Sequence, residues 1–172
     1  MRQDALYLAQ AICIGLGSKD VLRDRRVGAI IVRHGEVVGT GFRETIVLQN
    51  KPYKDITFHA EHRAILEADH KAKGATLYCL LEPCTKRSFL KGAWEPPPPC
   101  CEHIVNAGIS RVVYLIRDTD FGEGGKAYLE AHGIIVEVVS PEEVIKQLKD
   151  GHDLSDHTVA ELTTHRTYRE IQ

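Results

Sequence analysis

Short apolar segments alternate with helical segments through the second half of the chain, and this alternation constrains the fold more than any other feature. Strands are expected at residues 75–81, 111–116 and 134–139, with helices at 100–107 and 125–132 between them. A strand that is followed by a helix and then by another strand needs a crossover connection, so these strands should pair in parallel. The pattern therefore predicts an α/β domain.

The first half of the chain predicts a helix and a hairpin. Apolar residues recur at helical spacing over residues 5–16, and residues 27–32 form a continuous apolar run typical of a buried strand. A turn at Gly35 returns the chain as a second strand over residues 36–42. We therefore expect a three-layer α/β/α arrangement around a five-stranded mixed sheet, with its last strands parallel.

The remaining segments complete the predicted domain. Helices are expected at about residues 59–71 and 141–149, an irregular stretch at 43–57, and a loop at 84–99, which contains four consecutive prolines. Residues 1–150 are interpreted as one domain. Residues 151–172 are interpreted as a polar tail or an extra helix.

Composition limits the compartment and the partners. The formal net charge of −2 gives no global reason to bind a polyanion, which weighs against nucleic acid as the main partner. The N-terminus does not resemble a signal peptide, and no apolar run approaches the roughly 20 residues that span a bilayer. A cytoplasmic, reducing setting is therefore expected, in which the five cysteines serve as metal ligands or core residues.

Three chemically active segments fall where strands and helices meet. His59 and Glu61 open a predicted helix, Cys84 follows a strand, and Cys100 opens the next helix. In a parallel sheet such junctions converge at one edge, where ligand sites form. One histidine and two cysteines make an open ligand set suited to a catalytic zinc, with the fourth position left for water.

These segments resemble the zinc deaminases of the cytidine-deaminase-like superfamily. The resemblance rests on His59-Ala60-Glu61, on Pro83-Cys84 after a strand, and on the later cysteine-headed helix, and it spans roughly residues 1–140. It implies a cytidine-deaminase-like fold and a zinc-dependent amidine hydrolase that releases ammonia. Zinc would be held by His59, Cys84 and Cys100.

The same resemblance implies the other roles. Glu61 would move protons between water, the substrate ring and the leaving amine, and Ala60 would line the base pocket. Two roles are considered for Cys101, an alternative metal ligand and a core residue. Oligomers, most simply dimers, are expected because these deaminases commonly pair.

The spacing of the cysteines departs from the usual pattern. Fifteen residues separate Cys84 from Cys100, where the common signature has two. A widened gap that ends in Pro-Pro-Cys is similar to the pyrimidine deaminase of riboflavin biosynthesis, which often carries a reductase domain. This chain is too short to hold that domain, so we expect a stand-alone deaminase or a divergent relative with another substrate.

Residues between the two cysteines are candidates for substrate specificity. Lys86 and Arg87 are interpreted as cations that hold a sugar phosphate under a lid, and the alternative is a solvated insertion with ordinary surface charges. Two other residues have open roles. Glu82 either orients a zinc ligand or ends a strand, and His62 lies either on the helix surface or just behind the ligands.

Three functions are compared. The leading hypothesis is a deaminase of a small nucleobase, nucleotide or riboflavin-pathway aminopyrimidine phosphate, with a small molecule as its partner. A deaminase of tRNA or single-stranded DNA would need a basic groove, and the net charge counts against it. The third is a non-catalytic, zinc-stabilised interaction domain, in which Cys101 supplies a fourth ligand.

Overall fold

The computed structural model describes residues 2–17, 26–46, 56–86, 98–117 and 124–151. Their secondary structure follows the predicted order. In chain order the elements are α1 (Arg2–Leu16), β1 (Gly28–Arg33), β2 (Glu36–Phe42), β3 (Glu44–Ile46), β4 (Ile56–Phe58), α2 (Ala60–Ala68), the 3₁₀ helix η1 (Asp69–Ala72), β5 (Thr76–Leu81), α3 (Cys100–Asn106), β6 (Arg111–Ile116), α4 (Gly125–Ala131), β7 (Ile135–Val138) and α5 (Pro141–Gly151).

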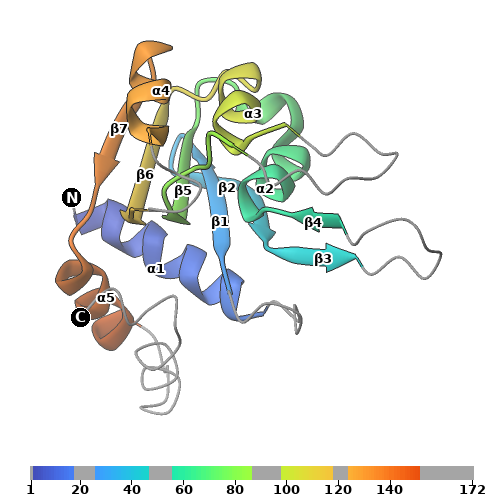
Figure 1. Cartoon of the computed structure of the whole chain (residues 1–172). Helices are drawn as coiled ribbons and strands as arrows, with labels where there is room; N and C mark the ends of the chain where they lie inside the picture. Colours follow the sequence, from blue (N-terminus) through green and yellow to red (C-terminus); the bar gives the residue numbers. More distant parts are fainter. Residues whose placement is uncertain (1, 18–25, 47–55, 87–97, 118–123, 152–172) are drawn as a thin grey trace.

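The main sheet has five strands in the order β2-β1-β5-β6-β7 (Figure 1). Strand β1 pairs antiparallel with β2 and with β5, whereas β5, β6 and β7 pair in parallel. This confirms the predicted mixed sheet with parallel last strands. The parallel order also brings the carboxyl ends of β5 and β6 to one edge, where a site is expected.

Helices cover both faces of the sheet, which confirms the three-layer prediction. Helix α1 packs on β1, β5 and β2 with α5 beside it, and α2, α3 and α4 occupy the opposite side (Figure 1). Helix α2 lies very close to β2, because a Cβ atom at Gly41 would fall 2.1 Å from the carbonyl oxygen of Ala60. The glycine therefore lets the start of α2 rest directly on the sheet.

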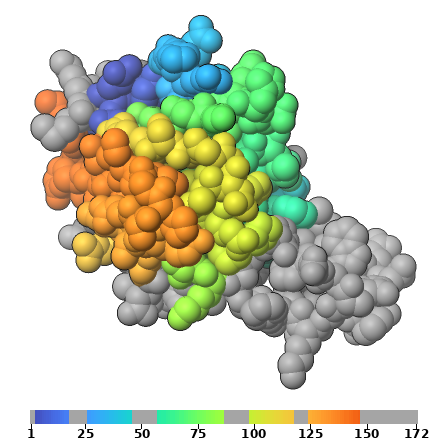
Figure 2. Space-filling view, turned by 90° about the horizontal axis from the view of Figure 1, so that it is seen from above, coloured from blue at the N-terminus to red at the C-terminus, as the bar shows by residue number. Residues whose placement is uncertain are grey.

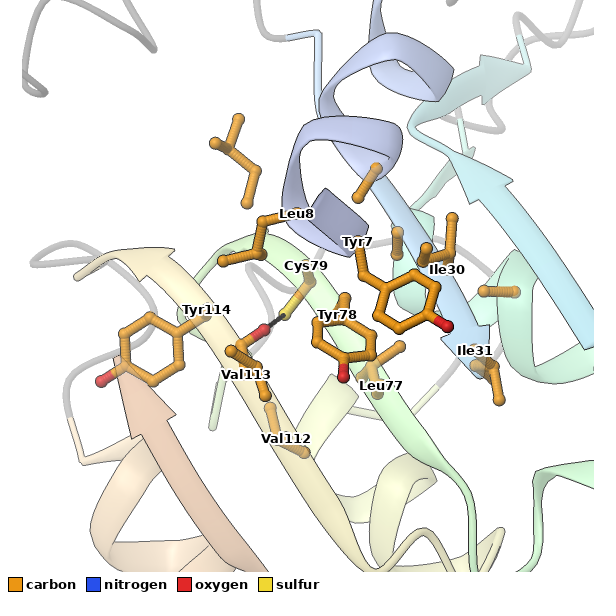
Figure 3. Packing of buried hydrophobic residues seen from close by; sticks show 14 of the residues in the cluster. Tyr7, Leu8, Ile30, Ile31, Leu77, Tyr78, Cys79, Val112, Val113 and Tyr114 are labelled. Carbon is orange, nitrogen blue, oxygen red and sulfur yellow. Dashed lines mark hydrogen bonds between the residues drawn. The ribbon is translucent and has the colours of Figure 1, made fainter. Parts of the chain in front are cut away.

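The core extends over both faces of the sheet, and Figure 3 shows the part of it near α1. The rings of Tyr7 and Tyr78 lie beside each other with their centroids 5.0 Å apart. The Cys79 thiol points at the carbonyl of Val113 on the neighbouring strand. Ile31 of β1 is fully buried, as the continuous apolar run of that strand predicts.

Two local features differ from the predictions. The stretch 43–57, predicted as irregular, contributes to the two-stranded sheet of β3 and β4, in which Thr45 pairs with Thr57. The helix expected over 59–71 is α-helical only to Ala68 and then tightens to η1, and Asp69 between them has a φ of 50°. The small sheet ends at Phe58, directly before the predicted ligand His59.

A buried ion pair ties α1 to the sheet edge opposite the carboxyl ends of the parallel strands. The Asp4 carboxylate accepts hydrogen bonds from the Tyr78 hydroxyl at 2.9 Å and from the Arg111 guanidinium at 2.7 Å. Burial alone would raise the pKa of Asp4, but the hydrogen bonds from Arg111 and Tyr78 outweigh it and hold that pKa well below its ordinary value. Arg111 also pairs with Glu137 on β7.

Replacing Asp4 with asparagine should destabilise the domain by about 2 kcal/mol at pH 7, because a buried charged hydrogen-bond partner is lost. Because the folded pKa is depressed, this contribution is present above the ordinary pKa of about 4 and disappears as the pH falls toward the folded value. Urea unfolding at pH 7 and at pH 3 measures the difference. Glu36→Gln on the exposed start of β2 is the control, and an equal loss in both variants would contradict the prediction.

Within the described residues, no helix combines the length and the apolar character needed to cross a membrane.

Candidate metal centre

Three residues from separate elements meet at the carboxyl edge of the parallel strands. His59 directly precedes α2, Cys84 lies just beyond β5, and Cys100 is the first residue of α3. Their ligand atoms all lie within 4.8 Å of one another, with the histidine half-buried and both cysteines buried. The structure thus brings together the three residues for which the sequence predicts metal binding.

The distances within this cluster fit a zinc ion. Nδ1 of His59 lies 3.2 Å from Sγ of Cys100 and 3.6 Å from Sγ of Cys84. Ligands at about 2.0–2.3 Å from a tetrahedral zinc are roughly 3.5 Å apart, so the group needs little movement to bind one. Two sulphurs and an imidazole are also the donor types that zinc prefers.

The surroundings of Cys84 favour the thiolate, which is the form that binds metal. The hydrogen bond with Cys100 and the nearby His59 lower the pKa of the Cys84 thiol, against the opposing effect of burial. The backbone N–H of Cys100 also donates to the sulphur of Cys84 at 3.4 Å. Such contacts hold negative charge on sulphur before a metal arrives.

Cys101 lies in the core and outside the ligand group. Its side chain is 1% exposed, and its thiol donates to the carbonyl of Pro83 at 3.2 Å. Burial raises the pKa of Cys101 to about 12, so the thiol stays protonated. Among the described residues the cluster therefore offers three candidate ligands, the number typical of an open, catalytic zinc site.

Glu61 and Ala60 form the first turn of α2, beside the cluster in sequence. The Glu61 side chain is only 4% exposed, and its charge contributes to the raised pKa of the Cys101 and Cys79 thiols. The N-terminal turn of a helix favours a carboxylate through the helix dipole. A buried acid thus lies two residues after the candidate ligand His59, and Ala60 is fully buried.

Of the two cations predicted to hold a sugar phosphate, Lys86 and Arg87, the structure describes only Lys86. Lys86 is exposed two residues beyond Cys84. Arg87 lies outside the described residues. The lid and the solvated insertion both remain open predictions.

Glu82 supports the site from behind. Its carboxylate accepts a hydrogen bond from the backbone N–H of Lys126 at 2.9 Å, in the first turn of α4. Helix α4 approaches closely, because a Cβ atom at Gly125 would lie 2.4 Å from the carbonyl oxygen of Pro83. Helices α3 and α4 lie side by side on this face (Figure 2). Glu82 therefore fastens α4 to the segment that carries Cys84; this hydrogen bond orients no ligand.

His62 is buried, so the prediction that it lies on the helix surface was wrong. Its side chain is 2% exposed, and its ring lies 4.6 Å from that of His103. Nδ1 lies 3.6 Å from Sγ of Cys100, and Nε2 lies 2.8 Å from the carbonyl oxygen of Pro98. The alternative prediction, a place behind the ligands, agrees with these contacts.

Comparison with known families decides the class of the site. Residues 1–116 match the family model described as the cytidine and deoxycytidylate deaminase zinc-binding region. The chain belongs to this family. Zinc is therefore its cofactor, and the cluster of one histidine and two cysteines offers the ligands that such a metal needs.

Relatives with related sequences carry names from riboflavin biosynthesis. The riboflavin biosynthesis protein RibD of Aquifex aeolicus is 39% identical over 126 residues, which cover 72% of this chain and 31% of that protein. The diaminohydroxyphosphoribosylamino-pyrimidine deaminase of Buchnera aphidicola from Acyrthosiphon pisum is 32% identical over 151 residues, covering 86% of this chain and 92% of that protein. The chain thus spans about a third of the Aquifex protein and most of the Buchnera deaminase.

Solved structures share the fold. RibD of Acinetobacter baumannii superposes with a TM-score of 0.62 at 27% identity, covering 94% of this chain and 40% of that one. The bifunctional deaminase and reductase of Thermotoga maritima gives a TM-score of 0.59 at 30% identity, covering 94% of this chain and 42% of that one. The cytidine-deaminase-like fold implied by the sequence motifs is confirmed.

Proposed function

We propose that this chain is a zinc-dependent hydrolytic deaminase of a diaminohydroxyphosphoribosylaminopyrimidine, the compound in the names of its relatives. One observation carries the proposal: His59, Cys84 and Cys100 form a three-residue cluster, and His59 directly precedes the helix whose first turn carries the buried acid Glu61. Three ligands leave a position for water, and a buried acid can move the protons that deamination requires.

In this proposal His59, Cys84 and Cys100 hold the zinc. Bound zinc lowers the pKa of water to about 7 and so supplies hydroxide at neutral pH. Glu61 would take one proton from the attacking water and deliver it to the ring nitrogen, and would then move the second proton of that water, from the hydroxyl now bonded to the ring carbon, to the departing amine. Ala60, fully buried at the start of α2, contributes backbone to the wall of the base pocket.

A small phosphorylated substrate suits the charges of the chain better than a polynucleotide does. The net charge of −2 provides no broad positive surface, whereas the exposed Lys86 lies close in sequence to Cys84. One or two cations are enough to hold a single phosphate. We assign Lys86 to the ribose phosphate, and Arg87 keeps the same role as a sequence prediction.

A non-catalytic zinc domain is disfavoured by Cys101. That proposal needs a fourth protein ligand, and the Cys101 thiol instead donates to the carbonyl of Pro83 within the core. Structural zinc sites are almost always closed by four protein ligands.

We also propose a single domain over residues 1–150, a small molecule as the main partner and a homodimer as the assembly. All five cysteines are free, including the pair at the metal centre. Free thiols persist in a reducing compartment, which supports a cytoplasmic location.

Ammonia release by the zinc-loaded protein tests the proposed activity. The panel holds the diaminohydroxyphosphoribosylaminopyrimidine, the same compound without its phosphate, cytidine, deoxycytidylate, guanine and a short single-stranded RNA. We expect turnover of the phosphorylated pyrimidine, at least ten times faster than of the form without phosphate, because a charge-assisted contact is worth about 1.5 kcal/mol or more.

Two results would contradict the proposal. Faster turnover of the RNA, with binding that weakens steeply as salt rises, would favour the nucleic-acid deaminase. Absence of turnover on every compound, with one zinc bound per chain, would favour the interaction domain.

A further inference from the structure

His62 links two elements that carry zinc ligands. His59 precedes α2, whereas Cys100 begins α3, and fifteen residues separate Cys100 from the preceding ligand Cys84. The distance between His59 and Cys100 therefore depends on how α2 is held against the start of α3. His62 lies in the first turn of α2, buried at 2% exposure, where these two elements meet.

The hydrogen bond to Pro98 places a hydrogen on Nε2 of the His62 ring. Nε2 of His62 lies 2.8 Å from the carbonyl oxygen of Pro98, and a carbonyl oxygen can only accept. Nε2 therefore carries a hydrogen and donates it. The other ring nitrogen, Nδ1, lies 3.6 Å from Sγ of Cys100, so the ring fills the space between the carbonyl and the sulphur.

The short link from Pro98 to Cys100 transmits this restraint. Pro98 and Pro99 have ring-restricted φ angles, so the direction of the chain into Cys100 varies little once the Pro98 carbonyl is fixed. Pro99 is the N-cap of α3 and makes no side-chain capping hydrogen bond. The His103 ring, one turn further along α3, packs against His62 at 4.6 Å and supports the same contact.

We propose that His62 is a positioning residue for the zinc centre: it holds the Pro98–Cys100 segment against α2, so that the Cys100 sulphur lies within binding distance of His59. The inference rests on the ligand set assigned under the proposed function. It gives His62 no contact with substrate. Residues just behind metal ligands typically change metal affinity by about 10–100-fold when they are replaced.

Zinc affinity of three variants tests this role. Glutamine places its amide nitrogen near the position of Nε2 and can still donate to Pro98, whereas asparagine is too short and leucine has no donor. In competition with a chromophoric chelator, we expect His62→Asn and His62→Leu to bind zinc at least tenfold more weakly, and His62→Gln to stay within about threefold of the parent. His70→Asn, at a side chain 79% exposed, is the control.

Two further measurements separate positioning from general stability. In the cobalt-substituted protein, the sulphur-to-metal charge-transfer band should shift in His62→Asn and stay in place in His62→Gln. Urea unfolding of the zinc-free variants shows how much stability each substitution removes. The proposal would be overturned if the zinc affinities followed the order of stability and His62→Gln bound zinc as weakly as His62→Leu. Unchanged zinc affinity in all three variants would overturn it as well.

The parent protein supplies a test that needs no substitution. Nitrogen-15 NMR of its histidines should show one Nε2-bound hydrogen that is protected from solvent exchange. The signal is assigned to His62 by its absence in His62→Asn or, if that variant does not fold, by the contact of this hydrogen with Pro98. A ring without a hydrogen on Nε2 would overturn the inference. Failure of the parent to bind zinc would instead overturn the proposed function, so the two failures are distinguishable.

Discussion

Replacing Glu61 with glutamine is expected to reduce turnover by about 10²–10⁴-fold while the zinc content stays at one ion per chain. The substitution keeps the size of the side chain but removes its ability to take and deliver a proton, which is worth that range in general acid–base catalysis. Glu61 is not among the three ligands of the cluster, so the metal should remain bound. Ammonia release and metal analysis of the same sample measure both quantities.

Thermal unfolding of the same variant provides the control. Glu61 is buried, so glutamine could also act by loosening the fold. A melting temperature within a few degrees of the parent, together with lost turnover, assigns the effect to proton transfer. Turnover within threefold of the parent would show that another group moves the proton and would remove Glu61 from the mechanism.

Replacing Cys84 with alanine should lower zinc affinity by more than about 100-fold and bring turnover to background. The change removes one of the three proposed protein ligands. Its effect on zinc affinity should exceed the 10–100-fold loss typical of replacing a residue that only orients a ligand. Chelator treatment of the parent should have the same consequence for turnover, and added zinc should restore it. Competition with a chromophoric chelator measures the affinity.

Cys101→Ala is the matched control for this prediction. The residue lies next to a ligand in sequence, but its thiol is in the core, bound to the carbonyl of Pro83. We expect it to keep zinc affinity within a few-fold and to lose about 1 kcal/mol of stability. An equal loss of zinc in both variants would mean that Cys101 is a ligand and would reopen the structural-zinc interpretation.

The fold was predictable wherever one segment carries its own pattern. The apolar run at 27–32 and the alternation of strands and helices after residue 75 contain enough information for β1 and for the parallel strands. Strands β3 and β4 were missed because each has three residues and is stabilised by pairing across the intervening chain. Three residues are too few to show a period.

The cluster of His59, Cys84 and Cys100 could be predicted because each residue lies at a junction that the secondary structure already fixes. His62 and Glu82 could not be assigned in the same way. The partner of His62 is a carbonyl 36 residues away, and that of Glu82 is a backbone N–H 44 residues away. A backbone partner leaves no trace in residue identity, so only the structure connects them.

The two cysteine segments are joined directly by two hydrogen bonds. The backbone N–H of Cys101 donates to the carbonyl of Cys84 at 3.1 Å, and the Cys101 thiol donates to that of Pro83 at 3.2 Å. The two ends of the intervening stretch are therefore held next to each other by these hydrogen bonds. We expect the part of this stretch before Pro98 to tolerate changes in length and composition without breaking these two hydrogen bonds. New substrate preferences can thus arise while the candidate metal centre stays the same.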